Sequence, residues 1–144
     1  MNKRNKLILS FALVVILLIV IVVILTEEPS DSVSTSAKTI DKNLLVGNWL
    51  RTDSDYRLQI SEVNEDFTLE AKYFNPNPIN VGRASWQESY GSLKIIVELR
   101  DVNYPGSTYT LNYLPDKNLL AGDYYQAVEG LTFYVEFTRI THKN

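Results

Sequence analysis

Residues Leu7 to Leu25 form an unbroken apolar run in which Ser10 is the only polar residue. Nineteen residues at about 1.5 Å each give a helix about 28 Å long, close to the thickness of the hydrocarbon core of a bilayer. No polar face interrupts the run, so a helix buried in a soluble core is disfavoured. The pattern therefore predicts a transmembrane helix over 7–25, with the lipid bilayer as the partner of this segment.

The flanks of the run favour an uncleaved anchor over a cleaved signal peptide. A signal peptide has an apolar core of about 7–15 residues with a small-x-small cleavage site just beyond it, whereas the nearest such site here is Thr35-Ser36-Ala37. Lys3, Arg4 and Lys6 precede the run, and basic residues stay on the cytoplasmic side. We expect residues 1–6 in the cytoplasm and the chain after the anchor outside a plasma or inner membrane; cleavage is the alternative.

The stretch 26–42 is rich in Ser and Thr and almost free of bulky apolar residues. Such a composition buries too little surface to offset the entropy of ordering the chain. We expect a flexible linker there, followed by one extracytoplasmic domain over 43–144. About one hundred residues are enough for a single hydrophobic core, and since the chain has no cysteine, packing without disulfides must hold that domain together.

Apolar and polar residues alternate with a period of two through most of this domain. Tyr56-Leu58-Ile60 and Phe133-Val135-Phe137 are examples, each interleaved with polar residues. This alternation is typical of β-strands with one buried face. It predicts eight strands, over 47–52, 56–63, 67–74, 81–88, 93–100, 108–114, 119–125 and 131–140.

The connections between these strands are all short, so strands that follow one another are expected to pair in an antiparallel up-and-down meander. Eight such strands close most economically into a small β-barrel, because closure removes both edges of the sheet. A two-sheet β-sandwich is the alternative. Five tyrosines on the inward-facing phase indicate a lumen filled by side chains: Tyr56, Tyr73, Tyr109, Tyr113 and Tyr124.

Alternate connections of an up-and-down meander lie at opposite ends of the barrel. One end receives tight turns at 64–66, 89–92 and 115–118. The other end receives the connections 53–55, 75–80, 101–107 and 126–130, which are mostly longer and carry amide, aromatic and acidic residues. Loops held by a rigid scaffold often bind ligands, although Asn-Pro and Pro-Gly pairs are also ordinary turn formers. The candidate ligand-binding residues are Asn75, Asn77, Asn103, Tyr104 and Gln126.

Gly47-Asn48-Trp49 opens the first predicted strand, and Arg139 lies late in the last. These positions and the strand count resemble the lipocalin and avidin-like barrels. The resemblance implies that Gly47, Trp49 and Arg139 close the barrel, with Arg139 covering the Trp49 ring in a cation–π contact. No ligand residue carries over. The segments NPNPINV at 75–81 and NYPGSTY at 103–109 are similar to a small bacterial family of membrane-anchored β-domains without an assigned function.

Residues with catalytic chemistry are scarce. The chain has no cysteine and a single histidine, His142, near its C-terminus. Zinc sites, Cys–His dyads and Ser–His–Asp triads are therefore not expected, and the sequence indicates no cofactor, no metal and no enzyme. The alternative is a carboxylate-dependent hydrolase, which needs two acids about 5–10 Å apart. The acids predicted at the candidate end are Asp53, Asp55, Asp101 and Glu129.

Charge excludes one further class of partner. From Asn43 onward nine Lys and Arg stand against thirteen Asp and Glu, without a basic cluster, so nucleic-acid binding is not expected. The sequence thus predicts a single-pass, membrane-anchored, non-enzymatic binding domain for an unknown small molecule. The alternative is a protein-interaction subunit of a cell-envelope assembly.

Overall fold

The computed structural model describes residues 40–141, and the predicted transmembrane helix lies outside them, as does most of the predicted linker. Within this described part of the chain, no helix is long and apolar enough to cross a membrane. Its helical content is two short 3₁₀ helices, η1 (Lys42–Leu45) and η2 (Pro115–Lys117). Most of the rest is β-sheet.

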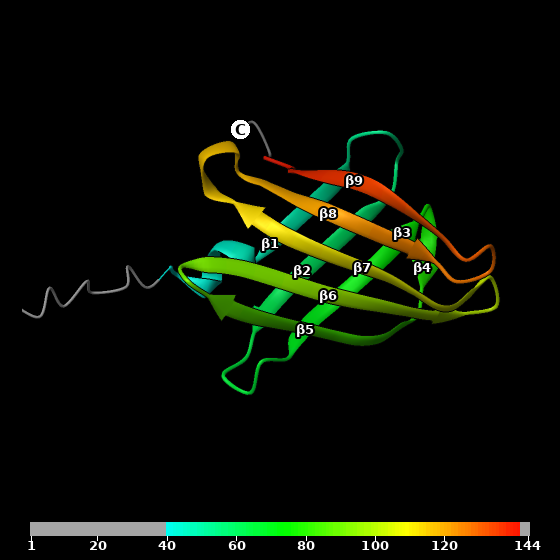
Figure 1. The fold of residues 1–144 in the computed structure, drawn as a ribbon, viewed down its shortest axis with the longest axis horizontal. Helices are drawn as coiled ribbons and strands as arrows, with labels where there is room; N and C mark the ends of the chain where they lie inside the picture. Colours follow the sequence, from blue (N-terminus) through cyan, green and yellow to red (C-terminus); the bar gives the residue numbers. More distant parts are fainter. Residues whose placement is uncertain (1–39, 142–144) are drawn as a thin grey trace, which may run out of the picture. The chain divides into compact units, whose positions relative to one another are not determined.

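Nine antiparallel strands form one sheet in the described residues (Figure 1). In chain order they are β1 (Gly47–Arg51), β2 (Arg57–Val63), β3 (Leu69–Asn75), β4 (Asn77–Ile79), β5 (Val81–Ser89), β6 (Ser92–Asp101), β7 (Tyr104–Leu114), β8 (Leu119–Gln126) and β9 (Leu131–Arg139). The first strand also pairs with the last, with Trp49 opposite Arg139. The sheet therefore runs β4-β3-β2-β1-β9-β8-β7-β6-β5 and curls back on itself.

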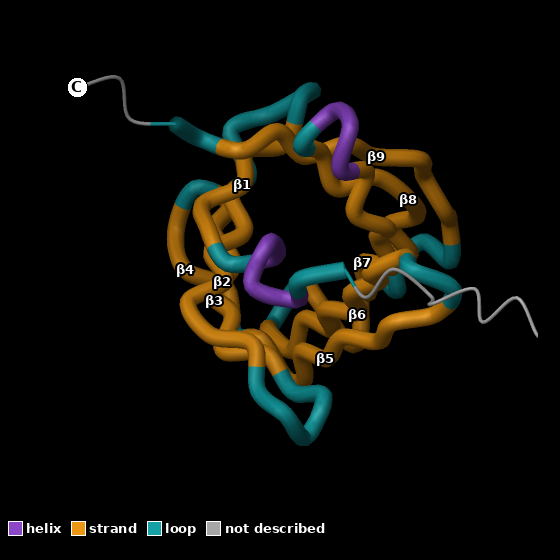
Figure 2. Tube along the Cα trace, turned by 90° about the vertical axis from the view of Figure 1, so that its left-hand side faces the viewer, coloured by secondary structure: helices purple, strands orange, loops and turns teal. Residues whose placement is uncertain are grey.

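The two outer parts of this sheet meet along β3 and β5. A single bridge joins Thr68 to Ser85, and the Trp86 N–H donates to the Phe67 carbonyl at 2.9 Å. The strands consequently form a nearly closed ring (Figure 2). This arrangement confirms the all-β, barrel-like prediction, and one continuous sheet takes the place of the two-sheet sandwich.

The predicted number of strands was wrong, because β4 lies inside the stretch 75–80 that was expected to be a loop. Asn75 pairs with Asn77 and Phe74 with Pro78, so the chain reverses direction around Pro76. Prolines usually argue against a strand because they cannot donate to the ladder. They are tolerated here because β4 is only three residues long and pairs with β3 alone.

The strand β7 begins at Tyr104, four residues before the predicted start at 108. Asp101 pairs directly with Tyr104, which reduces the expected loop 101–107 to a two-residue turn. Pro105 and Gly106 concealed this extension because both are poor strand formers. The sheet accommodates them at an irregularity in the register, where Pro105 lies opposite Arg100.

Inward-facing side chains fill the middle of the barrel. The largest fully buried ones are Trp49, Tyr73, Tyr109 and Phe137. The hydroxyls of Tyr73 and Tyr109 are 2.7 Å apart. Of the five tyrosines expected to face inward, four are buried, and Tyr56 is half-buried against the same core.

One end of the barrel is closed by η1, which lies within the ring of strands in Figure 2. Leu45, at the end of η1, is fully buried, and its carbonyl accepts a hydrogen bond from Trp49 Nε1 at 3.0 Å. The Arg139 guanidinium carbon lies 4.1 Å from the centroid of the Trp49 ring. The guanidinium also donates to three oxygens: the carbonyls of Leu44 and Val46 and Oδ1 of Asn118.

The described chain both enters and leaves the barrel at this closed end. Ile40 and Asp41 lead directly into η1, and the Ile140 N–H donates to the Asn48 carbonyl beside the start of β1 at 2.8 Å. The opposite end carries neither terminus of the described segment. It is the end to which the candidate ligand-binding connections belong.

Candidate functional site

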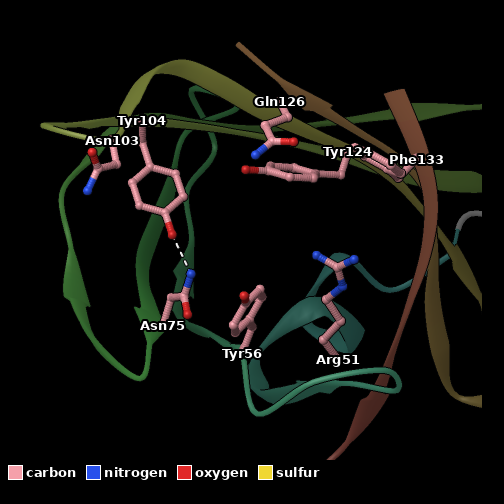
Figure 3. A pocket seen from close by; sticks show the side chains of 8 residues that line it. All are labelled: Arg51, Tyr56, Asn75, Asn103, Tyr104, Tyr124, Gln126 and Phe133. Atoms are coloured by element: carbon pink, nitrogen blue, oxygen red, sulfur yellow. Dashed lines mark hydrogen bonds between the residues drawn. The ribbon is translucent and has the colours of Figure 1, made fainter. Parts of the chain in front are cut away.

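A cavity of about 320 Å³ opens at the end of the barrel opposite η1 (Figure 3). Small-molecule sites usually measure about 300–1,000 Å³, so this cavity suits a ligand of single-ring size. Its walls come from strands and turns that are distant in sequence. The lining residues are Arg51, Tyr56, Asn75, Asn103, Tyr104, Tyr124, Gln126 and Phe133.

Four of the five candidate residues line this cavity: Asn75, Asn103, Tyr104 and Gln126. The fifth, Asn77, is exposed on β4 and is not among the lining residues. It was expected to share a loop with Asn75, but the two residues face each other across the tight bend at Pro76. The four predicted connections therefore do contribute to one cavity, through residues within them or next to them.

Asp101 fixes two of these connections relative to each other. Its Oδ1 accepts from the Val102 N–H at 2.8 Å and its Oδ2 from the Asn80 N–H at 3.1 Å. The same two bonds lower the pKa of the Asp101 carboxyl, because they stabilise its charged form. The carboxylate thus joins the connection 101–107, which carries Asn103 and Tyr104, to the connection 75–80, which begins with Asn75.

A direct hydrogen bond crosses the cavity mouth. The side-chain amide of Asn75, at the end of β3, donates to the hydroxyl of Tyr104, at the start of β7 (Figure 3). On the other side, buried Ser107 accepts from the Ala127 N–H at 3.1 Å and so ties the β8–β9 turn to β7. These bonds hold the rim in place, so the walls of the cavity are preformed.

Arg51 is the only charged residue among the eight lining residues. Its Nε lies 2.7 Å from Asp53 Oδ1, and its Nη2 donates to Asp53 Oδ2 at 3.0 Å. Its Nη1 donates to the Tyr109 hydroxyl at 3.4 Å. The guanidinium carbon also lies 5.4 Å from the Tyr56 ring centroid and 5.7 Å from that of Tyr124, within the range of cation–π contacts.

The protonation states at this site follow from burial and pairing. Burial acts to lower the pKa of Arg51, but its bonds to Asp53 and Tyr109 outweigh that effect and raise it. The hydrogen bond from Arg51 lowers the pKa of Asp53. Burial raises the pKa of Tyr109 to about 12. At neutral pH the cavity therefore contains a cation, next to a neutral phenol and a carboxylate at its edge.

Four of the lining residues were not among the sequence candidates: Arg51, Tyr56, Tyr124 and Phe133. Arg51 could have been predicted from its position in the strand. It lies two residues after Trp49, and residues two apart face the same side of a strand. A charged residue on the inward face of a barrel strand is unusual. Tyr56 and Tyr124 had been placed on the inward face, but as filling for the lumen.

The acids proposed for a hydrolase do not line this cavity, since none of its eight lining residues is Asp or Glu. Asp53 is paired with Arg51, and Asp101 accepts from two backbone amides. Within residues 40–141, no group of three or more His, Cys, Asp or Glu is placed to hold a metal ion. The cavity offers stacking surfaces, amide hydrogen bonds and one guanidinium, which are the means to bind a ligand.

No family model, curated protein or solved structure matches the chain. The resemblance to lipocalin and avidin-like barrels therefore stays a prediction. So does the similarity of its loop segments to a bacterial family. The function is therefore inferred from the geometry of the cavity and from the residues that line it.

Proposed function

We propose that the chain is a non-enzymatic binding protein that takes one small molecule in the open-end cavity. In this proposal residues 7–25 anchor the protein in the membrane and the barrel lies outside. The observation that carries the proposal is the convergence of aromatic and amide side chains on one preformed cavity of about 320 Å³. A concave site that combines aromatic walls with a few converging polar groups is a usual form of a small-molecule site.

Four of the eight lining residues are aromatic. Tyr56, Tyr104, Tyr124 and Phe133 come from four separated parts of the chain and face one space. Aromatic rings bury large apolar areas and stack on flat ligands. The amides of Asn75, Asn103 and Gln126 carry both donors and acceptors, so they provide the specificity that apolar walls lack.

Titration of the full chain with a panel of single-ring compounds, neutral, anionic and cationic, tests this proposal. The chain in uncharged maltoside micelles is followed by NMR through its side-chain amides. We expect saturable shifts at Asn75, Asn103 and Gln126, while Asn64 and Asn118 at the closed end stay unchanged. A panel without a saturable ligand, or shifts of equal size at both ends, would refute the cavity as the binding site.

A matched pair of variants separates cavity binding from surface binding. Gln126→Trp places an indole in the cavity, and Gln87→Trp places one on the exposed surface of β5. We expect the first variant to lose binding at least tenfold and the second to bind as the unaltered chain does. Circular dichroism of both variants verifies that the barrel is intact. Equal binding by both variants would contradict the proposal.

A second candidate function, a protein-interaction subunit, is favoured by apolar side chains at the same end. Val102 and Val128 lie in the turns β6–β7 and β8–β9 and are 91% and 62% exposed, and Leu131 at the start of β9 is 48% exposed. Exposed apolar clusters often mark contact surfaces. Since the chain lacks cysteine, Val102→Cys gives a unique attachment point for a photo-crosslinker. Capture of one envelope protein in native membranes would support this function, and recovery of monomer alone would count against it.

A further inference from the structure

We infer that the ligand of the open-end cavity is a small organic anion, with a carboxylate bound by Arg51 and a flat apolar body between the aromatic walls. This inference rests on the proposed function and names its ligand class. It is carried by the charge inside the cavity, the unused donors of Arg51 and the arrangement of the rings. Each of these comes from a different set of contacts.

The charge inside the cavity is positive. Arg51 lines the cavity, whereas its partner Asp53 does not. The Arg51 side chain is 12% exposed and the Asp53 side chain 59% exposed, so water screens the carboxylate more strongly than the guanidinium. No other charged residue is among the eight that line the space. A ligand carboxylate would enter a field that favours it, and a ligand ammonium group would not.

The Arg51 guanidinium also carries N–H groups that make no hydrogen bond to the described residues. Its two Nη nitrogens carry four N–H bonds. Among the described residues, Nη2 uses one for Asp53, and Nη1 uses one for the Tyr109 hydroxyl at 3.4 Å, longer than a usual N–H···O bond. Two Nη hydrogens are left for a ligand. Because the guanidinium is charged, the hydrogen bonds from these donors to a ligand carboxylate are of the strong, charge-assisted kind.

Aromatic rings hold the guanidinium in place for this task. Tyr56 and Tyr124 lie within cation–π distance of it, at 5.4 and 5.7 Å, and the ring of Tyr124 stacks on Tyr109 with centroids 4.4 Å apart. Figure 3 shows the Arg51 side chain reaching toward Tyr124 from the opposite wall. The Arg51 side chain is thus already ordered before a ligand binds, so binding costs less conformational entropy.

The remaining walls define the body of the ligand. Tyr104 and Phe133 are aromatic, and the polar groups near them are amides rather than charges. A flat ring can lie against these surfaces while its carboxylate reaches Arg51. The Asn103 and Gln126 amides then discriminate between substituents on that ring, since each carries a hydrogen-bond donor and an acceptor that a bound ring would cover.

Asp53 competes with the ligand for the same guanidinium. At neutral pH it is ionised, because the hydrogen bond from Arg51 lowers its pKa. Replacing its charge leaves Arg51 free to pair fully with an incoming carboxylate. Asp53→Asn should therefore bind anions more tightly, which is the opposite of the effect expected from damage to the site.

Benzoate and its neutral counterpart benzamide test the inference on the full chain in maltoside micelles. We expect benzoate to bind the unaltered chain at least tenfold more tightly than benzamide, with an affinity that falls as salt rises. Arg51→Gln should weaken benzoate binding by roughly ten- to a hundredfold, the usual loss for charge-assisted hydrogen bonds, and the loss for benzoate should exceed the loss for benzamide at least fivefold. Arg57→Gln is the matched control, because Arg57 lies over Phe74 on β3 and outside the cavity.

The outcomes separate this inference from the proposed function. Equal affinities for benzoate and benzamide, with no effect of Arg51→Gln, would overturn the anion inference and leave the binding function standing. Absence of binding by both compounds would also overturn it, and the wider panel would then decide the proposed function. If Arg51→Gln fails to fold, Asp53→Asn still decides: at least threefold tighter benzoate binding supports the inference, and unchanged or weaker binding refutes it.

Discussion

Replacement of Gly47 by alanine should open the closed end of the barrel. Gly47 has φ +153°, and a Cβ atom built there would lie 2.2 Å from Nη1 of Arg139. That distance is far inside van der Waals contact, so the guanidinium must move away. It would then lose its place over Trp49 and its bonds to the carbonyls of Leu44 and Val46.

The size of the effect follows from those contacts. The backbone conformation alone should cost an alanine about 1 kcal/mol. Displacing Arg139 removes a cation–π contact and charge-assisted hydrogen bonds, for about 2 kcal/mol more. We expect Gly47→Ala to lower the free energy of unfolding by about 3 kcal/mol in total. Gly130→Ala is the control, because Gly130 also has a positive φ, +67°, but open space where the Cβ would lie.

Urea unfolding followed by tryptophan fluorescence measures this change. The chain has two tryptophans, and both Trp49 and Trp86 lie in the barrel, so the signal reports the barrel alone. A double-mutant cycle with Arg139→Gln then isolates the contact. Gly47→Ala should cost only about 1 kcal/mol when Arg139 is already absent, which gives a coupling of about 2 kcal/mol. Additive costs, or equal costs for the two glycine variants, would refute the Arg139 contact as the cause.

Three further predictions concern the tyrosine core and the membrane topology. Tyr109→Phe should cost about 1–3 kcal/mol, because it leaves the buried Tyr73 hydroxyl without its partner. Tyr73→Phe should cost less, because the Tyr109 hydroxyl keeps its bond from Arg51. The double variant should cost less than the sum of the two, which a urea unfolding cycle checks. Burial raises the pKa of Tyr109 to about 12. The contribution of its neutral hydroxyl to the free energy of unfolding is therefore complete below about pH 10 and is lost as the pH rises through about 12. The urea midpoint should fall over this pH range, and it should fall less steeply in Tyr109→Phe. Protease added to intact spheroplasts should degrade the barrel if residues 7–25 are an anchor with a cytoplasmic N-terminus, and a protected barrel would contradict that orientation.

The strands could largely be predicted from the sequence because side-chain alternation is a local property of the chain. Alternation is clear in 57–60 and 134–138, and both lie in strands whose expected inward residues Leu58, Ile60, Val135 and Phe137 are buried. β4 could not be predicted in this way, because its three residues include Pro78 and show no alternation. Its pairing with β3 follows from the reversal at Pro76, which depends on tertiary contacts.

The candidate site was predictable only in part, for a similar reason. The order of connections along a meander predicts which loops share an end, and that was enough to bring Asn75, Asn103, Tyr104 and Gln126 together at one cavity. Whether the lumen is filled or hollow at that end depends on how side-chain volumes add up in three dimensions. Arg51 was missed although it lies in the predicted strand 47–52, because alternation along a strand does not show that a charged side chain will find partners inside the barrel, here Asp53 and Tyr109.

A crystal structure of the chain with the tightest-binding compound of the panel tests the central claim most directly. We expect electron density for one molecule in the open-end cavity, with its carboxylate at Arg51 and its ring against the aromatic walls. Density only on the outer face of β1 and β2, beside Arg57 and Phe74 in the smaller cavity there, would contradict the claim. So would an open-end cavity that stays empty at saturating ligand.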